Sequence, residues 1–272
     1  MSASFDRAVA YVRAHGDEFD QGRLDLLLGG PSLSNDQQRR FLAGQRADGG
    51  WPPFWAPDAS SFDATCYRLA QAEGLHMGTC YPQIAQGVAF IRARQRDDGS
   101  WEEDEALHEL APPWAKPGAL APRLYLTANC GWWLAETSLT STMVTADPAA
   151  RRAGDYLERH EAADGSLPSI LHAHWLAAGL WIRLGRQDLA DCVLDTLATR
   201  VTDDVAAGAL AWMLVTLGGL GIAPDHPLGQ TATSRLASLQ RADGGWTSED
   251  GPNRDPSVTV EALRGPRKWA AI

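Results

Sequence analysis

The heptapeptide QRADGGW occupies residues 45–51 and recurs, letter for letter, at residues 240–246. A near copy, QRDDGSW, occupies residues 95–101, and a more distant copy, EAADGSL, occupies residues 161–167. Each copy follows an amphipathic segment and precedes a polar or proline-bearing loop that leads into a more apolar segment. The repeating unit is therefore predicted to be a helix, a tight turn and a second helix.

The letters of the repeat have physical roles in a turn. An aspartate recurs, at Asp48, Asp97, Asp164 and Asp243. Its side chain can bond to its own backbone, and the neighbouring glycine permits the positive φ that a chain reversal needs. The tryptophans that close three copies are expected to pack against the glutamine six residues earlier and the adjacent helix end, where they stabilise the fold.

Two further segments, residues 5–30 and 187–223, show the same helix-turn-helix pattern without the motif. The chain then holds six predicted pairs, at residues 5–30, 35–77, 82–139, 148–185, 187–223 and 228–270. The first helix of a pair has one apolar stripe among charged residues, which is typical of a helix in contact with water. The second helix is apolar on nearly every face, which is typical of a buried helix.

This pattern predicts an all-α (α/α)6 barrel of six helical hairpins in two concentric rings. The inner ring is expected to contain residues 63–74, 124–136, 170–184 and 206–220. An open solenoid of hairpins is the alternative. Because no linker rich in Pro, Gly or Ser divides the 272 residues, we expect one domain spanning residues 1–272.

Composition limits the partners. The formal net charge is −10 and the pI is about 5.1, and no basic patch stands out, so we expect no nucleic-acid partner. The first residues carry no apolar signal-peptide core, so a cytoplasmic location is expected. Residues 205–223 carry no charge over 19 positions, but their glycines and their place in the repeat favour an inner helix over a transmembrane span.

The chain has four cysteines, which are Cys66, Cys80, Cys130 and Cys192. They form no C-x-x-C pair and belong to different hairpins. Neither a disulfide framework nor a zinc cluster is therefore indicated, and buried thiols are expected.

The glutamine-tryptophan repeat resembles that of the prenyltransferase and squalene-cyclase superfamily, whose members are built on (α/α)6 barrels. The resemblance extends over nearly the whole chain. The chain length of 272 residues suits the single-barrel type of class II terpene cyclase. It implies a terpene or meroterpenoid cyclase that begins polyene cyclisation by protonating an isoprenoid alkene or epoxide. Its partner would be a hydrophobic polyprenyl molecule, and peripheral contact with a membrane is compatible with such a substrate.

The family's proton donor is the middle aspartate of an Asp-X-Asp-Asp-Thr motif. Here residues 61–65 read SFDAT, so that Asp63 takes the donor position and Thr65 the position of the motif threonine, while Ser61 and Ala64 replace the flanking carboxylates. The alternative is that Asp63 is only a helix N-cap. His172 and His174 are the predicted partners that orient Asp63, with a hydrogen-bonded core or rim position as the alternative for each.

Aromatic faces can stabilise carbocations by cation–π attraction. The predicted substrate-binding residues, beside Thr65, are Tyr67, Tyr125, Trp132, Trp175 and Trp212. Simple core filling is the alternative for each of them. Residues 101–109, WEEDEALHE, form either a solvated loop or, if the substrate carries a diphosphate, a Mg²⁺-binding segment; otherwise no cofactor and no metal is expected.

Two other functions compete. The first is a non-catalytic barrel that binds an isoprenoid or a partner protein after losing the Asp-X-Asp-Asp acid. The second is a zinc prenyltransferase β-like subunit, whose family ligands are an Asp-x-Cys pair and a later histidine. That pair does not occur, because Asp63 and Cys66 are three positions apart.

Overall fold

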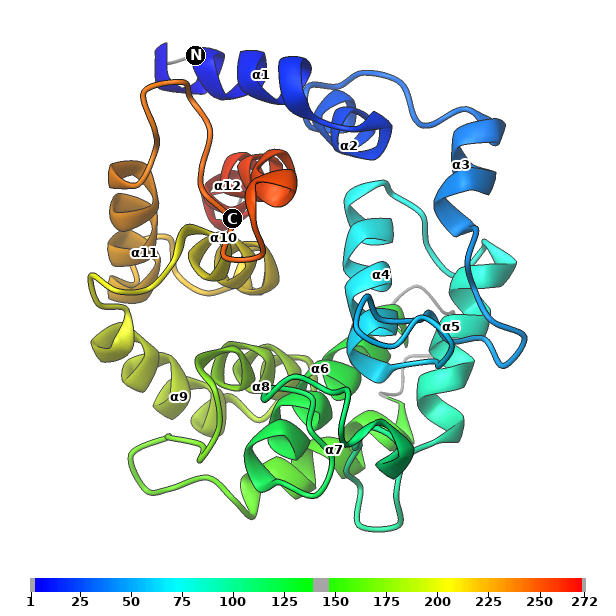
Figure 1. Cartoon of the computed structure of the whole chain (residues 1–272). Helices are drawn as coiled ribbons and strands as arrows, with labels where there is room; N and C mark the ends of the chain where they lie inside the picture. Colours follow the sequence, from blue (N-terminus) through cyan, green and yellow to red (C-terminus); the bar gives the residue numbers. More distant parts are fainter. Residues whose placement is uncertain (1–2, 139–146, 271–272) are drawn as a thin grey trace. The chain divides into compact units, whose positions relative to one another are not determined.

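The computed structural model describes residues 3–138 and 147–270. Its α-helices are α1 (Ala3–His15), α2 (Glu18–Leu27), α3 (Asn35–Leu42), α4 (Phe62–Gly74), α5 (Pro82–Ala93), α6 (Leu120–Ser138), α7 (Pro148–Glu158), α8 (Leu171–Arg183), α9 (Gln187–Arg200), α10 (Ala207–Leu217), α11 (Pro227–Ser238) and α12 (Asp255–Ala270). Two 3-10 turns, η1 (Glu105–Leu107) and η2 (Pro252–Arg254), precede α6 and α12. Taken two by two, these helices are the six predicted pairs (Figure 1), and residue 139 of the third predicted pair lies outside the described residues.

The chain forms two compact units. One contains residues 1–41 and 197–272, and the other contains residues 42–196. In the first unit α10 packs along α12, and α1 also contacts α12. In the second unit α6 lies between α7 and α8 and also contacts α4 and α5. The single domain predicted for the whole chain stays a prediction.

Burial separates the two helices of the fourth pair as predicted. In the outer helix α7 the buried residues include Ala150, Ala153 and Leu157, which lie on one stripe at spacings of three and four. In its partner α8 every residue from Ala173 to Trp181 is buried. Within the described part of the chain, no helix is both long enough and apolar enough to span a membrane.

The glutamine of each full repeat joins its turn to the first turn of another outer helix. Gln45 Nε2 donates to the Gly49 carbonyl at 2.8 Å and to the Gln83 carbonyl of α5 at 2.7 Å. The Gln95 amide donates to the carbonyls of Gly99 and of Ala149 in α7. The Gln240 amide donates to the carbonyls of Gly244 and of Ser4 in α1. The contact with a helix end is thus made by the glutamine amide, whose other partner is the turn carbonyl. The expected packing of the tryptophan ring against the glutamine stays a prediction.

The turn glycines lie directly against these helices. Gly49, Gly99, Gly165 and Gly244 have φ between +78° and +93°. A Cβ atom at Gly99 would lie 2.6 Å from the Arg152 carbonyl oxygen of α7, and one at Gly244 would lie 2.5 Å from the Arg7 carbonyl oxygen of α1. Glycine is thus required twice, for its conformation and for the close approach of two main chains.

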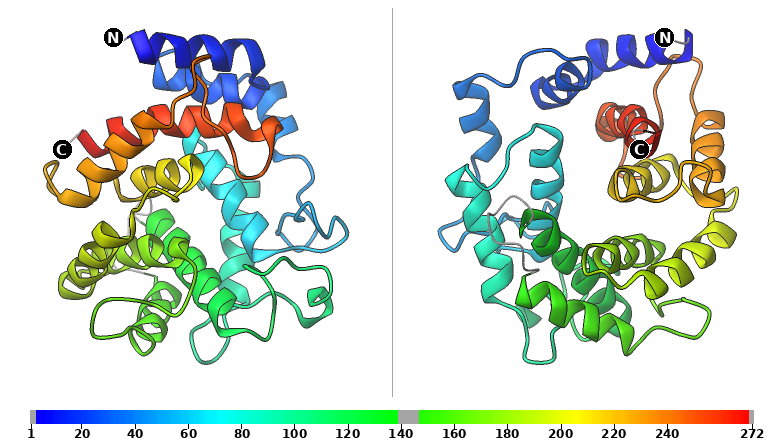
Figure 2. Two further views of the ribbon diagram at one scale, coloured as in Figure 1. Left: turned by 60° about the vertical axis from the view of Figure 1, so that its left-hand side comes forward. Right: turned by 180° about the vertical axis from the view of Figure 1, so that it is seen from behind.

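A hydroxyl of the following inner helix holds the end of the turn. The backbone N–H groups of Trp51, Trp101 and Trp246 donate to Thr65, Thr127 and Thr259 at 3.0 to 3.1 Å. The indoles of Trp101 and Trp246 donate to the carbonyls of Ile91 and Leu236 in the preceding helix. Figure 2 shows the segment after α11 running to α1, where Gln240 binds Ser4.

The aspartates also serve as predicted, with one correction. Asp48, Asp164 and Asp243 each accept from the backbone N–H two residues later. In the second repeat this acceptor is Asp98, which bonds to Ser100, and not the predicted Asp97. The sequence has two adjacent aspartates there, and the second stands next to the positive-φ Gly99.

We predict that Trp246→Ala lowers the free energy of unfolding by about 3–5 kcal/mol, the range for deleting a large buried aromatic side chain. The side chain is 5% exposed and its indole N–H donates to Leu236 at 2.7 Å. Urea unfolding measures the change. Phe54→Ala, at an 83% exposed position, is the control and is expected to change it by less than about 0.5 kcal/mol. Equal effects of the two substitutions would contradict the proposed role of the repeat.

Candidate active site at the start of α4

The start of α4 is built around a serine cap. Ser61 has extended backbone angles, and its Oγ accepts from the Ala64 N–H at 3.1 Å, so that Ser61 is the N-cap of the helix. Asp63 lies two residues further on, inside the first turn. The alternative in which Asp63 serves only as the cap is therefore wrong, because its neighbour fills that position.

The Asp63 carboxylate is directed toward other elements. Oδ1 accepts from the Tyr125 hydroxyl at 2.7 Å, and Oδ2 accepts from the Trp114 indole N–H at 3.3 Å. Asn129, one turn after Tyr125 on α6, donates to the same hydroxyl oxygen at 3.3 Å. Because that oxygen accepts from Asn129, the hydroxyl proton is directed to Asp63. Burial and the charge of Asp63 raise the pKa of Tyr125 well above its ordinary value, so Tyr125 remains a neutral donor.

A second carboxylate, Glu103, lies at the same helix start, although the sequence marked it only as part of the acidic run at residues 101–109. It is 3% exposed. Its Oε1 accepts from the Ser61 hydroxyl at 2.7 Å and from the Asp63 N–H at 3.1 Å, while Oε2 accepts from the Phe62 N–H at 3.1 Å. Burial raises the pKa of Glu103 to about 7, and these three donors act in the opposite direction.

Two carboxylates of the acidic segment, Glu102 and Glu103, form hydrogen bonds or ion pairs with other parts of the protein. Glu102 accepts from the Gly118 N–H at 2.6 Å and pairs with Arg123 and Arg96. Asp104 caps η1. These bonds hold the loop between the second repeat and α6, which carries Trp114. Asp104, Glu105 and Glu109 of this run are exposed, as the solvated-loop alternative predicts, whereas Glu102 and Glu103 are bound inside the protein. The Mg²⁺-binding alternative stays a prediction. Among the described residues no group of three or more His, Cys, Asp or Glu side chains could hold a metal ion.

His172 lies near this cluster. Its ring centroid is 4.4 Å from that of Trp175 and 6.2 Å from that of Tyr125. Burial lowers the pKa of His172 to about 4, so the imidazole is neutral near pH 7. His172 therefore brings a neutral ring toward Tyr125, and its predicted part in orienting Asp63 stays a prediction.

His174 and Thr65 have equivalent structural roles. The Leu167 N–H, at the end of the fourth turn, donates to His174 Nε2 at 3.1 Å, and His174 Nδ1 lies 3.2 Å from the Ile170 carbonyl one turn earlier. Thr65 accepts from Trp51 and donates to the carbonyl of Ser61 one turn earlier in the same way. Both side chains hold a repeat turn, and both ring nitrogens of His174 are used by the main chain.

The predicted aromatic residues divide by position. Tyr125, Trp132 and Trp175 are buried in the unit that contains Asp63, and Tyr67 of α4 is 47% exposed. The Arg183 guanidinium lies over the Trp132 ring at 5.9 Å. Trp212, half-buried on α10, belongs to the other unit. The structure thus gathers Tyr125, His172 and Trp175 with Asp63.

The cysteines are free thiols, and two of them adjoin the site. Cys66 and Cys130 are buried with their sulfurs 3.8 Å apart, and burial raises the pKa of both thiols. Cys80 is exposed and Cys192 is half-buried, which corrects the expectation of buried thiols at all four positions.

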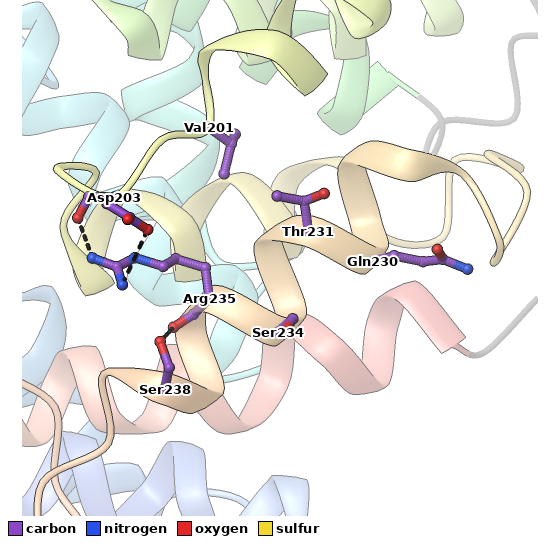
Figure 3. A pocket seen from close by; sticks show the side chains of 7 residues that line it. All are labelled: Val201, Asp203, Gln230, Thr231, Ser234, Arg235 and Ser238. Carbon is purple, nitrogen blue, oxygen red and sulfur yellow. Dashed lines mark hydrogen bonds and ion pairs between the residues drawn. The ribbon is translucent and has the colours of Figure 1, made fainter.

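A hollow of about 520 Å³ lies elsewhere, in the unit of residues 1–41 and 197–272 (Figure 3). It is lined by Val201, Asp203, Gln230, Thr231, Ser234, Arg235 and Ser238. Arg235 pairs with Asp203 across it, and the Ser238 hydroxyl donates to the Arg235 carbonyl (Figure 3). Its charges satisfy each other, so it offers no proton donor comparable with Asp63.

Comparison with known proteins gives a likeness of structure. No protein-family model matches the chain, and no curated protein matches it significantly in sequence. The apo structure of the type II terpene cyclase MstE from Scytonema is 15% identical, with a TM-score of 0.65 over 98% of both chains. An arginine-to-alanine variant of MstE in complex with geranylgeranyl dihydroxybenzoate has 15% identity and a TM-score of 0.64 over 98% of this chain and 97% of that one.

A protein from Actinoplanes is 17% identical, with a TM-score of 0.62 over 98% of this chain and 99% of its own. These likenesses cover almost the entire chain at low identity, and they show the fold. The all-α helical-barrel class predicted from the repeat is confirmed.

We predict that His174→Gln retains most of the stability that His174→Ala loses. Gln offers an acceptor oxygen in the region of Nε2, whereas Ala leaves the buried Leu167 N–H unsatisfied at a cost of about 1–3 kcal/mol. Thermal unfolding of both variants measures this. If imidazole chemistry were the function of His174, both variants would lose activity alike; Gln is expected to preserve it.

Proposed function

We propose that this chain is a class II-type terpene or meroterpenoid cyclase, in which Asp63 protonates an isoprenoid alkene or epoxide. The observation that carries the proposal is the placement of Asp63 on an inner helix with one oxygen held by Tyr125 and the other facing the Trp114 indole. The fold likeness to MstE, whose structures include a substrate and a product complex, supports the same reaction class.

The hydrogen bonds define which oxygen would carry the proton. Because Oδ1 accepts from Tyr125 at 2.7 Å, the transferable proton belongs on Oδ2, where the Trp114 contact is longer. After transfer to an alkene carbon, the new C–H bond uses the π electrons and leaves a carbocation on the substrate. The Tyr125 hydroxyl stabilises the carboxylate that remains on Asp63, which makes Asp63 a stronger acid.

The surroundings suit a carbocation. The rings of Tyr125 on α6 and Trp175 on α8 are buried, and each lies against His172; aromatic faces of this kind attract cations. His172, with its pKa lowered to about 4, is too weak a base to capture the proton near neutral pH. A prenylated aromatic acid or a simple polyprenyl chain fits this chemistry, and a diphosphate substrate would add a requirement for Mg²⁺. A cytoplasmic location with peripheral membrane contact is proposed with it.

The test is incubation of the purified protein with a panel of polyprenyl substrates, including geranylgeranyl dihydroxybenzoate, followed by chromatography and mass spectrometry. Cyclisation by protonation and final deprotonation gives a product of unchanged mass and altered retention. Binding without any turnover by the parent protein would favour the alternative, a non-catalytic isoprenoid-binding or partner-binding barrel.

We predict that Asp63→Asn lowers kcat by about 10²–10⁴-fold or more, because the amide keeps an acceptor for Tyr125 but has no acidic proton. Substrate binding, measured by tryptophan fluorescence, and the melting temperature are expected to change little. An MstE variant with one aspartate replaced by asparagine is described in complex with substrate, which shows that such a variant of that enzyme binds.

The control for this prediction is Asp58→Asn, at an exposed position of the loop before α4. It makes the same carboxyl-to-amide change in the same unit and is expected to leave kcat unchanged. If Asp63→Asn cyclises at the parental rate, Asp63 is not the donor.

A further inference from the structure

We propose that Glu103 is the positioning residue for the catalytic proton: it carries the negative charge of the Asp63–Glu103 pair, so that Asp63 keeps the proton. This inference rests on the function proposed above and extends it to a residue 40 positions from the motif. It addresses a requirement that the sequence leaves unmet, since Ser61 and Ala64 replace the carboxylates that flank the donor in the resembling family.

The hydrogen bonds decide which carboxyl is ionised. Two of the three donors to Glu103 are the backbone N–H groups of Phe62 and Asp63, which can donate but never accept. Both oxygens of Glu103 therefore accept hydrogen bonds that stabilise its ionised form. At Asp63 the bond from Trp114 to Oδ2 is longer, at 3.3 Å, and therefore stabilises an ionised Asp63 less.

The helix start adds to this preference. The N-terminus of α4 presents unpaired N–H groups that stabilise one nearby anion, and Glu103 bonds directly to two of them. Ionisation of the neighbouring Asp63 carboxyl would place a second negative charge at this helix start, and the charge on Glu103 opposes it. The pair is therefore expected to hold one proton over a range of pH, as interacting carboxyls do. Burial, together with the charge of Asp63, raises the pKa of Glu103 to about 7, so the two carboxyls resist double ionisation. This shift taken alone would leave the proton on Glu103, and the assignment of the proton to Asp63 therefore rests on the hydrogen bonds at the helix start.

Other titratable groups around the pair are neutral or engaged. On α4 and α6 the thiols of Cys66 and Cys130 and the phenol of Tyr125 have raised pKa values, and on α8 the pKa of His172 is lowered. On the loop and the start of α6, Glu102 pairs with Arg123 and Arg96. On α5, Arg92 pairs with Asp147 and Arg94 with Asp48. The charge on Glu103 thus acts on Asp63 with little competition from these groups.

The sign of the pH dependence follows. An anion at Glu103 raises the pKa of Asp63, so that the protonated, active form persists to higher pH. In Glu103→Gln that anion is absent and the pKa of Asp63 falls. The limb on which kcat decreases with rising pH is expected to move to lower pH by about one unit or more, while kcat at the acidic end of the profile stays near the parental value.

A second variant restores the negative charge lost in Glu103→Gln by placing a carboxylate at residue 61. Ser61 is hydrogen-bonded to Glu103, and Asp is as good an N-cap as Ser. In Ser61→Asp combined with Glu103→Gln the carboxylate and its neutral partner exchange places, so the helix start keeps one anion. We expect the limb to return toward its parental position, which a purely structural loss at Glu103 would not produce.

The experiment measures kcat against pH for the parent, Glu103→Gln and the double variant, with melting temperatures for all three. In parallel, infrared titration of the protonated carboxyl band, taken as a difference from Asp63→Asn, reports the proton on Asp63 without any turnover. If the parent cyclises nothing, the proposed function fails, and the infrared titration still tests the proton assignment. An Asp63 that is ionised in the parent at neutral pH, or one whose titration is the same in Glu103→Gln, would overturn the inference.

Discussion

The contact between a turn glycine and the main chain of an outer helix governs the fold. At Gly99 and Gly244 a Cβ atom would lie within 2.6 Å of a carbonyl oxygen on α7 and α1, so the two backbones touch with no side chain between them. The glutamine amide then ties the same turn to the first turn of the same helix. Close approach fixes the distance between neighbouring helices, and the amide fixes their register. A threonine of the inner helix that follows accepts a hydrogen bond from the tryptophan N–H at the end of each full repeat, so that helix is tied to the same point.

Much of the fold follows from the sequence because the repeat is local. A seven-residue motif contains the turn, its aspartate, its glycine and its glutamine, and the flanking segments differ clearly in hydrophobicity. What the motif did not predict are the partners of these groups. The hydroxyl of Thr65 and the ring of His174 perform the same task in two turns, and this equivalence is visible only when both are seen bound to a turn N–H. The residue type of His174 suggested proton chemistry, whereas its position calls for an acceptor.

The candidate site was predicted in part for the same reason. Asp63 and Tyr125 were both singled out, the first from a motif position and the second from its place on an inner helix, and the structure joins them at 2.7 Å. Trp114 and Asn129 were missed because nothing in their local sequence marks them, and Glu103 was considered only as part of a solvated or Mg²⁺-binding run. Glu103 lies in an acidic run that would normally be solvated, and its burial depends on the loop held by Glu102 and Gly118. Two features of the sequence together could have indicated Glu103. It is a carboxylate two residues after the second repeat, and the start of α4 has Ser61 and Ala64 where the resembling family has carboxylates.

The position of Glu103 at the start of α4 shows that a carboxylate is present there although the motif carboxylates are absent. A helix N-terminus favours an ionised group, so a donor placed there alone would lose its proton too easily. Two solutions are physically equivalent: neighbouring carboxylates within the helix turn, or one buried carboxylate brought from elsewhere that occupies the N–H groups itself. Glu103 has the geometry of the second, with two backbone donors of α4 and the cap hydroxyl bound to it. Since an anion acts through distance and burial rather than through its position in the sequence, the absence of Asp-X-Asp-Asp is compatible with an intact acid. The relevant criterion is how many carboxylates meet at the start of α4, and there are two.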